Sequence, residues 1–495
     1  MSKNLKKGIT AKKNENFSEW YSQVCLEQGA QLADIRYGIQ GFIVIRPWAY
    51  KIIRKIYDAF DAEVEKDGHQ PFLFPTVIHE DNLKKEREHA GFIPEVFWVT
   101  KEGEKELKEK FALRPTGETA IYPLYSLWIR SHKDLPYKGY QSRITVFRNE
   151  MATRPFIRGR EFCFYETHDV FLNHDEAIGQ IKKDMQIMDK VISGRLKIPF
   201  LFFKRPSWDH FLGANATYVS DTVLPDGKRL QISSTHDLGQ NFAKAYNIKF
   251  TDKDKKEKYC WQTCFGPGIS RIFASLISIH GDDNGLILPF DFAPVQIVII
   301  PILFSDKKEL NKKVIVKCKE LKTKLEKEGY IVEFDDSEST SGFKHNEWEM
   351  KGVPLYIEVG PKELSKNIAT LKRRTNNQKT QVKISKLLDE LKKQKVKFEK
   401  ELENNAKNYF KEKTKTAKDF NDLKNILKTH KGFVMVNFCS VEEGGKKCAD
   451  ILKEETQGGN VCGTLFDKQQ KVKEGSKCVV CNKKANHAVY IAKSY

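Results

Sequence analysis

Long hydrophobic runs are missing from this sequence, and so are the features of an exported chain. No stretch approaches the roughly eighteen consecutive apolar residues of a membrane-spanning helix. The first residues, MSKNLKKGITAKKNENF, are polar and rich in lysine and lack the apolar core of a signal peptide. The chain contains 10 cysteines, which without export indicate a reducing compartment. We therefore expect a cytoplasmic protein with no membrane partner.

The sequence has fewer acidic than basic residues. Asp and Glu number 66 against 85 Lys and Arg, which gives a formal net charge of +19. Clustered positive charge favours a polyanionic partner, because binding releases the counterions of its phosphates. About ten of these charges come from residues 371–430. The lysine-rich segment 377–430 either contacts RNA or forms a solvated helix face, and the charge pattern leaves both interpretations open.

Internal repeats and low-complexity tracts are absent, and 495 residues are enough for two or three domains. Apolar side chains recur at helical spacing over 48–67, and Pro71–Pro75 has the pattern of a strand bounded by prolines. Further strands are expected at 143–150, 161–170 and 229–235. This pattern predicts a central antiparallel sheet surrounded by helices over residues 1–290.

After Pro294 the pattern changes to alternating strands and helices. Strands are expected at Gln296–Pro301, Tyr330–Phe334, Leu355–Val359 and Ile368–Lys372, and helices at 307–328 and Asn346–Lys351. The alternation predicts a small α/β unit over residues 291–378. Residues 379–495 then comprise a long basic helix, from Ile384 to about Phe410, and a small α+β domain with half of the cysteines. The chain as a whole is predicted to be of the α/β class.

The most informative stretch is Arg143–His168, RITVFRNEMATRPFIRGREFCFYETH. Residues two apart on a strand share a face, so Arg148 and Glu150 point the same way. A returning strand likewise presents four side chains on one face: Phe162, Phe164, Glu166 and His168. Aromatic and charged groups mixed on one face are typical of a binding pocket. A surface hairpin with salt bridges has a similar pattern, so this stretch alone leaves both possibilities open.

Other segments offer groups suited to a nucleotide or an amine. The loop after Glu150 contains three arginines that suit a triphosphate: Arg154, Arg158 and Arg160. In FGPGISR, glycines precede Arg271 in the first turn of an apolar helix, an arrangement typical of an anion or nucleotide site. In RPTGET, Thr116 and Glu118 can receive an amine, although an ordinary helix N-terminus has the same composition.

The last part of the chain has the spacing of a metal site. Cys478 and Cys481 form a Cys-x-x-Cys pair, preceded by Cys439 and Cys448. Two such pairs bind zinc tetrahedrally, and four protein ligands leave no open position, so the metal would be structural. Because the first pair is widely spaced, Cys462 and His487 remain alternative ligands. The remaining cysteines are expected in the core: Cys25, Cys163, Cys260, Cys264 and Cys318.

Together these segments resemble the three signature motifs of class II aminoacyl-tRNA synthetases. Pro75 ends the first, Arg148-x-Glu150 with the basic loop and Arg160-Glu161-Phe162 forms the second, and the glycines before Arg271 form the third. The sequence is most similar to prolyl-tRNA synthetases, through RPTGET, FRNE, GREF followed by ETH, THDLGQNF and HGDDNGLILP. RPTGET and THDLGQNF disfavour threonyl and glycyl enzymes. A non-catalytic relative would be free to lose Arg148, Glu150 or Arg271.

The resemblance implies a role for each matching residue. The expected ATP contacts are Arg148, Glu150, Arg160, Phe162, Gln231, Ser234 and Arg271, with Arg148 and Arg271 as the catalytic arginines. The expected proline contacts are Thr116, Glu118, Arg148, Phe164, Glu166, His168 and His236. The implied reaction is attack of the proline carboxylate on the α-phosphate of ATP, with Mg²⁺ on the other phosphates, followed by transfer to the terminal ribose of tRNA(Pro).

The resemblance also implies a homodimer, an anticodon-binding domain over 291–378, and zinc on Cys439, Cys448, Cys478 and Cys481. Lys344, Glu358 and Arg373 are candidate anticodon readers, since single-stranded bases are what proteins read in RNA. About 60 residues separate His168 from Gln231, too few for an inserted editing domain. Misactivation of alanine is expected, because one lost methylene costs only about 1–3 kcal/mol of discrimination.

Overall fold

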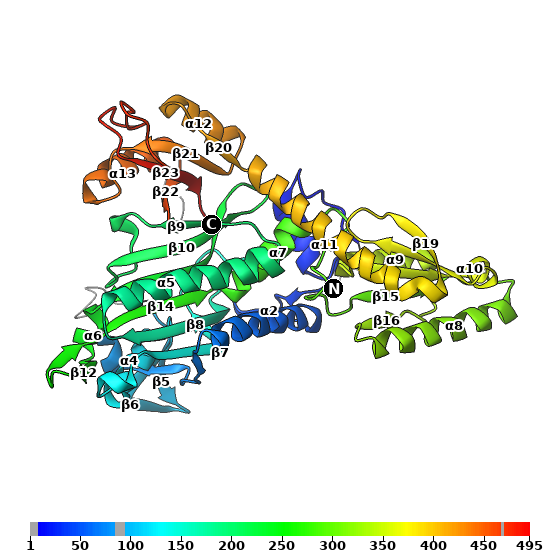
Figure 1. The fold of residues 1–495 in the computed structure, drawn as a ribbon, viewed down its shortest axis with the longest axis horizontal. Helices are drawn as coiled ribbons and strands as arrows, with labels where there is room; N and C mark the ends of the chain where they lie inside the picture. The colour runs from blue at the N-terminus through cyan, green and yellow to red at the C-terminus, as the bar shows by residue number, and fades with distance from the viewer. Residues whose placement is uncertain (1–7, 85–94, 467–469) are drawn as a thin grey trace.

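A computed structural model describes residues 8–84, 95–466 and 470–495 of the chain (Figure 1). Mixed helices and largely antiparallel sheets confirm the predicted fold class. Within these residues, none of the helices combines the length and the hydrophobicity that crossing a bilayer requires. The long helix α11 (Leu387–Glu412) runs between the α/β unit that carries β15–β19 and the C-terminal strands (Figure 1).

An antiparallel sheet forms the centre of the first 290 residues. Its strands lie in the order β9 (Leu201–Lys204), β10 (Ala216–Val223), β11 (Arg229–Gly239), β14 (Trp261–Pro267), β8 (Glu161–Phe171), β7 (Tyr137–Phe147) and β3 (Gln70–Pro71). Only the short pair of β3 with β7 is parallel. The central antiparallel sheet predicted from the sequence is therefore present.

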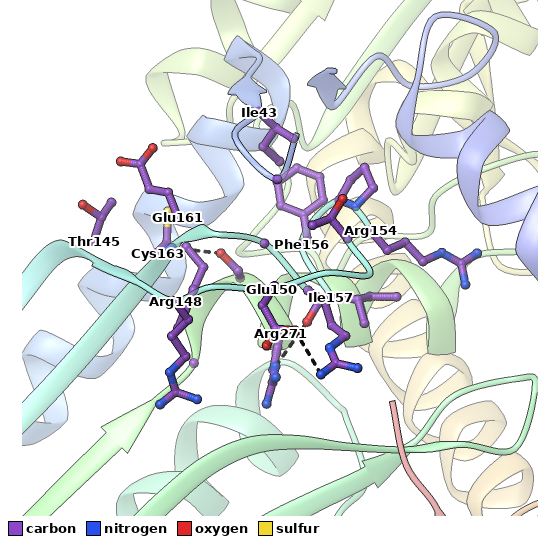
Figure 2. A pocket seen from close by; sticks show the side chains of 18 of the residues that line it. Ile43, Thr145, Arg148, Glu150, Arg154, Phe156, Ile157, Glu161, Cys163 and Arg271 are labelled. Atoms are coloured by element: carbon purple, nitrogen blue, oxygen red, sulfur yellow. Dashed lines mark hydrogen bonds and ion pairs between the residues drawn. The ribbon is translucent and has the colours of Figure 1, made fainter. Parts of the chain in front are cut away.

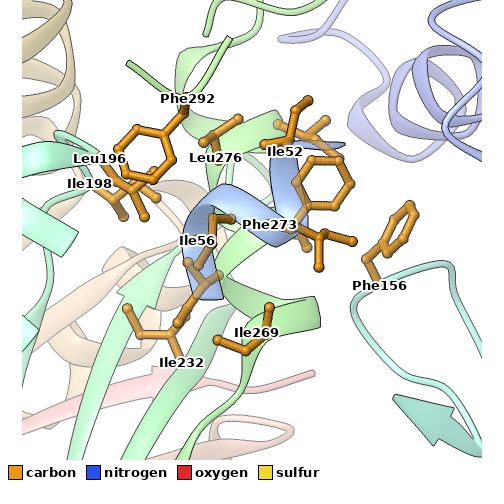
Figure 3. Close-up of a cluster of buried hydrophobic side chains, with 14 of the residues drawn as sticks. Ile52, Ile56, Phe156, Leu196, Ile198, Ile232, Ile269, Phe273, Leu276 and Phe292 are labelled. Carbon is orange, nitrogen blue, oxygen red and sulfur yellow. The ribbon is translucent and has the colours of Figure 1, made fainter. Parts of the chain in front are cut away.

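Helices pack against this sheet and close its core. They are α1 (Phe17–Cys25), α2 (Pro47–Lys66), α5 (His174–Met188), which continues into a π-helical turn over Asp189–Arg195, and α7 (Ile269–His280). Ile52 and Ile56 of α2 meet Phe273 of α7 and Ile232 of β11 in the main core (Figure 3). The apolar spacing over 48–67 is thus a helix buried along one face, as predicted.

Smaller elements complete this part of the chain. They are β1 (Ala33–Asp34), β2 (Val44–Ile45), β4 (Val77–His79), β5 (Trp98–Glu102), β6 (Lys105–Leu113), α4 (Glu118–Trp128), α6 (Asn241–Ala245), β12 (Lys249–Thr251) and β13 (Glu257–Tyr259). A second cluster of buried apolar residues, including Tyr122, Tyr125 and Phe242, joins α4 and α6 to the sheet.

Two strand predictions need correction. The strand expected over Pro71–Pro75 stops at Pro71, and only the Phe72 amide continues the pairing, by donating to Tyr140 O at 2.8 Å. The strand expected over 143–150 ends at Phe147, because the chain turns there into the loop before β8. Arg148 and Glu150 therefore lie just beyond the strand.

The α/β unit is a five-stranded sheet flanked by helices. The strand order is β16 (Val332–Phe334), β15 (Ile297–Pro301), β17 (Leu355–Val359), β18 (Ile368–Arg373) and β19 (Lys379–Lys383). The helices are α8 (Lys308–Lys327), α9 (Ser341–Lys351) and α10 (Pro361–Ser365). The four predicted strands and two predicted helices are present. The division of the chain at 290 and 378 stays a prediction, and β19 pairs with β18 beyond residue 378.

The C-terminal strands extend the first sheet instead of forming a separate one. Their order is β20 (Thr414–Thr416), β21 (Phe433–Phe438), β23 (His487–Lys493) and β22 (Gly459–Leu465), with helices α12 (Phe420–Thr429) and α13 (Lys446–Glu455) beside them. β22 pairs with β9 through Thr464–Lys204 and Leu465–Phe203, so the complete sheet has 11 strands.

Candidate active site

A cavity of about 460 Å³ opens where β8, β11 and the start of α7 meet the loop that follows β7. Six of the seven predicted ATP contacts line it: Arg148, Glu150, Phe162, Gln231, Ser234 and Arg271. Residues 38–43, which the sequence analysis did not single out, form another wall. Arg148 and Arg271 extend in the same direction, whereas Arg154 points away (Figure 2) and donates to Ser18 O at 2.9 Å.

Arg148 is held over an aromatic ring. Its guanidinium carbon lies 5.7 Å from the centre of the Phe162 ring, within the range of a cation–π contact. Burial lowers the pKa of Arg148, and the carboxylates of Glu150 and Glu118 raise it in part. Glu150 itself is paired with Arg158, Oε2 to Nη2 at 3.0 Å. Because arginine stays protonated in proteins, this wall offers fixed positive charge to a phosphate.

Arg271 lies in the first turn of α7, as the sequence predicted. Its Nε donates to Ile157 O at 3.2 Å and its Nη1 donates to Gln231 O at 3.3 Å. Burial, and then the charges of Arg148 and Arg158, lower the pKa of Arg271 to about 10, so it remains a cation at neutral pH. On the preceding strand β14, a Cβ at Gly266 would lie 2.7 Å from the Phe164 ring, which explains the glycine at this position.

A second cavity, of about 280 Å³, adjoins the first. All seven residues predicted to contact proline line it: Thr116, Glu118, Arg148, Phe164, Glu166, His168 and His236. Five residues line both cavities: Arg148, Phe164, Gln231, Ser234 and Gly266. The two cavities therefore meet at Arg148, where an acyl group from one side and a phosphate from the other would be in reach.

Glu118 is a buried carboxylate with two neutral donors. It lies in the first turn of α4, with 2% of its surface exposed. Thr116 Oγ1 donates to Oε2, and the Cys264 thiol donates to Oε1 at 3.3 Å. Burial raises the pKa of Cys264 well above its usual range, so the thiol keeps its proton. Neither donor neutralises the carboxylate, which remains available to a cationic amine.

Glu166 and His168 lie beside Glu118 in the smaller cavity, and one polar atom of each of the three side chains lies within 4.8 Å of the other two. Glu166 accepts from the Gly117 amide at 3.2 Å and from Gln141 Nε2 at 3.0 Å. His168 Nε2 lies 3.3 Å from Glu166 Oε2, and its Nδ1 lies 3.1 Å from Tyr122 Oη. Burial lowers the pKa of His168, but its contact with Glu166 outweighs that effect and leaves the pKa raised.

His236 gives the cavity an uncharged side. Its Nδ1 lies 3.0 Å from Thr217 Oγ1, and its ring lies 4.6 Å from that of Phe211. Burial lowers the pKa of His236 to about 4, so the ring is neutral at neutral pH. Together with Phe164, these groups suit an apolar ring, whereas the carboxylates of the same cavity suit its charged nitrogen.

Arg160 is not among the lining residues of either cavity. Its Nε donates to Glu150 O at 3.1 Å, so it holds the backbone that presents Glu150. Residues of the smaller cavity that the sequence analysis did not single out include Arg205, His210, Phe211, Thr217 and Arg229. The sequence pattern indicates Arg205 only weakly, because the residue directly follows an apolar strand and precedes a proline.

The candidate anticodon readers lie within the α/β unit. Lys344 is buried and donates to Asp335 O at 2.8 Å. Arg373 is also buried, and it forms an ion pair with Glu401 at 3.0 Å. Glu358 pairs with Lys379 at 2.8 Å. These side chains already have protein partners, and their role in reading bases stays a prediction.

Four cysteines of the C-terminal part come together. One ligand atom each of Cys439, Cys448, Cys478 and Cys481 lies within 4.8 Å of the other three. The sulfur atoms of Cys439 and Cys448 are 3.7 Å apart. Tetrahedral zinc with bonds of about 2.3 Å requires a sulfur separation of about 3.8 Å, so this set fits the metal. Cys462 lies in a different apolar cluster, and neither it nor His487 belongs to the group.

Comparison with known proteins agrees with this geometry. Residues 97–280 match the family described as tRNA synthetase class II core domain (G, H, P, S and T). Residues 296–394 match an anticodon binding domain, and residues 420–495 match the C-terminal domain of prolyl-tRNA synthetase. The chain is 50% identical to the proline–tRNA ligase of Thermofilum pendens and 41% identical to that of Methanococcoides burtonii, in each case over 99% of both chains.

Solved structures are similar over the whole length. Giardia lamblia prolyl-tRNA synthetase in complex with prolyl-adenylate has a TM-score of 0.93 and 33% identity, covering 98% of this chain and 100% of that one. The Cryptosporidium parvum enzyme, complexed with halofuginone and AMPPNP, has a TM-score of 0.91 and 33% identity, covering 99% and 97%.

The fold and the two joined cavities, together with these matches, define a class II aminoacyl-tRNA synthetase. The family indicated by the sequence motifs is confirmed by relatives that match along almost the whole chain. This chain belongs to the prolyl-tRNA synthetase family, the proline–tRNA ligases.

Proposed function

We propose that the larger cavity binds ATP and the smaller one binds proline, so that the chain forms prolyl-adenylate where the two meet. The observation that carries this proposal is the position of Arg148, which lines both cavities. The Giardia lamblia relative was solved with prolyl-adenylate, a molecule that contains both halves. Ligation of proline to tRNA is the activity of the family.

In the larger cavity, Phe162 stacks on the adenine and Glu150 accepts from its amino group. Arg271 covers the nucleotide from α7, with Gln231 and Ser234 as further contacts. Arg160 acts through the Glu150 carbonyl to which it donates. Glu150 and Glu161 both line this cavity, so carboxylate oxygens of the kind that Mg²⁺ prefers are present. When bound, Mg²⁺ would supply positive charge to the phosphates.

In the smaller cavity, Glu118 and Thr116 receive the charged nitrogen of proline. Glu166 and His168 close the polar side, and Phe164 and His236 pack on the ring. The proline carboxylate then points to Arg148 at the junction. Its oxygen attacks the α-phosphorus in line, a new P–O bond forms, and the bond to pyrophosphate breaks. No base is needed for this step, so alignment and positive charge from Arg148 and Arg271 are what the chain supplies.

The transfer step requires tRNA(Pro), whose terminal ribose hydroxyl attacks the adenylate. The α/β unit matches an anticodon binding domain, which supports a tRNA partner at that end of the molecule. The lysine-rich α11 has a buried apolar side, including Phe398 and Leu402, and an exposed charged side. That exposed side is available either to tRNA or to solvent.

We further propose a structural zinc on Cys439, Cys448, Cys478 and Cys481, and a homodimer. The zinc would join the turn after β21, helix α13 and the loop before β23, and none of its four ligands lines either cavity. For the dimer, the support is an exposed apolar patch near β3 and α4. Leu73 is 85% exposed and Leu127 is 59% exposed, and their chain neighbours Phe72 and Trp128 stack with ring centroids 5.8 Å apart. A second copy of the chain would cover this patch.

Amino-acid-dependent ATP–pyrophosphate exchange, run over all twenty amino acids, tests the assignment. We expect strong exchange with proline, weaker exchange with alanine, and loss of both in Arg148→Ala. Exchange that depends on a different amino acid would overturn the roles given to Thr116, Glu118 and His168. Light scattering of wild type and of Leu73→Asp/Leu127→Asp tests the dimer: wild type at the mass of one chain would refute it.

A further inference from the structure

Arg205 connects the C-terminal strands to the junction of the two cavities. It is the first residue after β9, and its side chain is 3% exposed. Its Nη1 donates to Cys462 O of β22 at 2.8 Å, and its Nη2 donates to Gln231 Oε1 at 3.1 Å. The same guanidinium is paired with the fully buried Asp221, 3.1 Å from its Oδ2. The planar guanidinium of Arg205 therefore links the Cys462 carbonyl in the C-terminal part to the Gln231 side chain, which lines both cavities.

The contact with Arg205 fixes which end of the Gln231 amide faces the ligands. An amide has a carbonyl oxygen that accepts and an NH₂ group that donates. Because Arg205 donates to the oxygen, the NH₂ group is left for the cavities, where proline and ATP present acceptors: a carboxylate and phosphate oxygens. If the Gln231 amide were rotated by 180°, its carbonyl oxygen would face the oxygens of the proline carboxylate and the phosphates and would repel them.

We propose that Arg205 is a positioning residue for proline activation, which orients Gln231 and is itself held by the Cys462 carbonyl. The inference deepens the proposed function, because it assigns the C-terminal strands a part in the chemistry at the joined cavities. The Arg205 guanidinium is held by Asp221 and by the Cys462 carbonyl of β22. Displacement of β22 therefore moves the guanidinium, and with it the Gln231 side-chain amide.

Gly463 offers a way to displace β22 without replacing a residue that lines either cavity. It follows Cys462 at a break in the strand register, with φ +127°. A Cβ there would collide with the Lys204 carbonyl oxygen and lie 3.3 Å from Arg205 Cα. Gly458, near the start of the same strand, has φ +106° and nothing within 4 Å of an added Cβ. Gly458→Ala is therefore a matched control with similar backbone strain and no collision.

The test is a double-mutant cycle measured by proline-dependent ATP–pyrophosphate exchange. Arg205→Met is expected to lower kcat about 10- to 100-fold, as a misplaced group does, with the proline KM changed less than about 3-fold. In a Gln231→Ala background the same change should cost less than about 3-fold, because its target is gone. Arg229→Met also removes a partner of Asp221, 2.8 Å away, and its effect should multiply with that of Gln231→Ala.

Equal losses from Arg205→Met in both backgrounds would mean a general structural role and would overturn the proposal. Gly463→Ala should reproduce the fall in kcat, and Gly458→Ala should keep the wild-type value. A folded Gly463→Ala enzyme with wild-type kcat would refute the link to β22. If Gly463→Ala does not fold, the Arg205–Gln231 cycle decides alone. Absence of proline-dependent exchange in wild type would instead refute the proposed function.

Discussion

Replacing Glu118 by glutamine tests the part of the site that selects for proline. The substitution keeps the shape of the side chain and removes its charge. In wild type both carboxylate oxygens accept hydrogen bonds, one from Thr116 and one from Cys264, and the charge is left for the ligand nitrogen. The glutamine NH₂ group must face one of these two donors, so the variant also loses a hydrogen bond inside the protein.

The size of the effect follows from these contacts. A hydrogen bond to a charged group contributes about 1.5–3 kcal/mol, which corresponds to a factor of about 10 to 150 in binding. We therefore expect the proline KM of Glu118→Gln to rise by roughly that factor, with the ATP KM changed far less, since Glu118 lines only the smaller cavity.

Pyrophosphate exchange with titrated proline, and calorimetry of proline binding, measure this change. Glu257→Gln is a suitable control, because Glu257 is exposed on β13 and lines neither cavity. A proline KM within about 2-fold of wild type would refute the assignment of Glu118 as the amine receptor, because even the lower bound predicts a larger change.

Four other outcomes are expected. Wild type should contain one zinc per chain by mass spectrometry; Cys481→Ser should lose it and melt at a lower temperature, whereas Cys462→Ser, outside the cluster, should retain it. Arg374→Met should cost about 1.5–3 kcal/mol of unfolding free energy in denaturant titration, because buried Arg374 donates two hydrogen bonds to Asp282, whose carboxylate is 41% exposed and stays accessible to water once the arginine is gone; an unchanged midpoint would contradict this. Burial, and then Asp169, raise the pKa of Asp184 to about 8 from 3.8. Between pH 3.8 and about 8 the folded state therefore keeps a proton on Asp184 that the unfolded state has released, so the free energy of unfolding falls as the pH rises through this range. Asp184→Asn should flatten the plot of unfolding free energy against pH. Parallel plots for wild type and variant would refute the buried proton. Alanine should support exchange with a kcat/KM lower than that of proline by about 1–3 kcal/mol for each lost methylene, and complete rejection of alanine would contradict the pocket.

Much of the active site could be predicted from the sequence because its residues lie on regular strands. The alternation of Phe162, Phe164, Glu166 and His168 requires one face, and β8 has that face toward the cavities. Glu118 and Arg271 were also predictable, since each lies in the first turn of a helix whose start is visible in the sequence. Family resemblance then supplied their roles, which local pattern alone left open.

Other features depend on contacts that the local pattern does not contain. Arg205 meets Cys462, which is 257 positions away, only because β9 pairs with β22. The pairing of β22 with β9, which joins the C-terminal strands to the first sheet, was likewise not predictable, because strand order across a sheet is set by long-range pairing. Lys344 and Arg373 were predicted only as candidate anticodon readers, and the sequence did not indicate that each is buried against an acidic or carbonyl partner. The charge of a residue can be read from the sequence, whereas its exposure depends on tertiary packing.

The order of strands in the large sheet has a consequence for how the chain is made. β23 lies between β21 and β22, although it follows both of them in the chain. During synthesis β21 can therefore pair only with β20 until β23 emerges, and β22 can pair only with the short strand β9. The anchor on Arg205 forms late for the same reason, so a ribosome-bound chain that already contains every ligand-lining residue is expected to lack the mature site. Acquisition of activity should then follow the emergence of β23, and not the completion of the catalytic core.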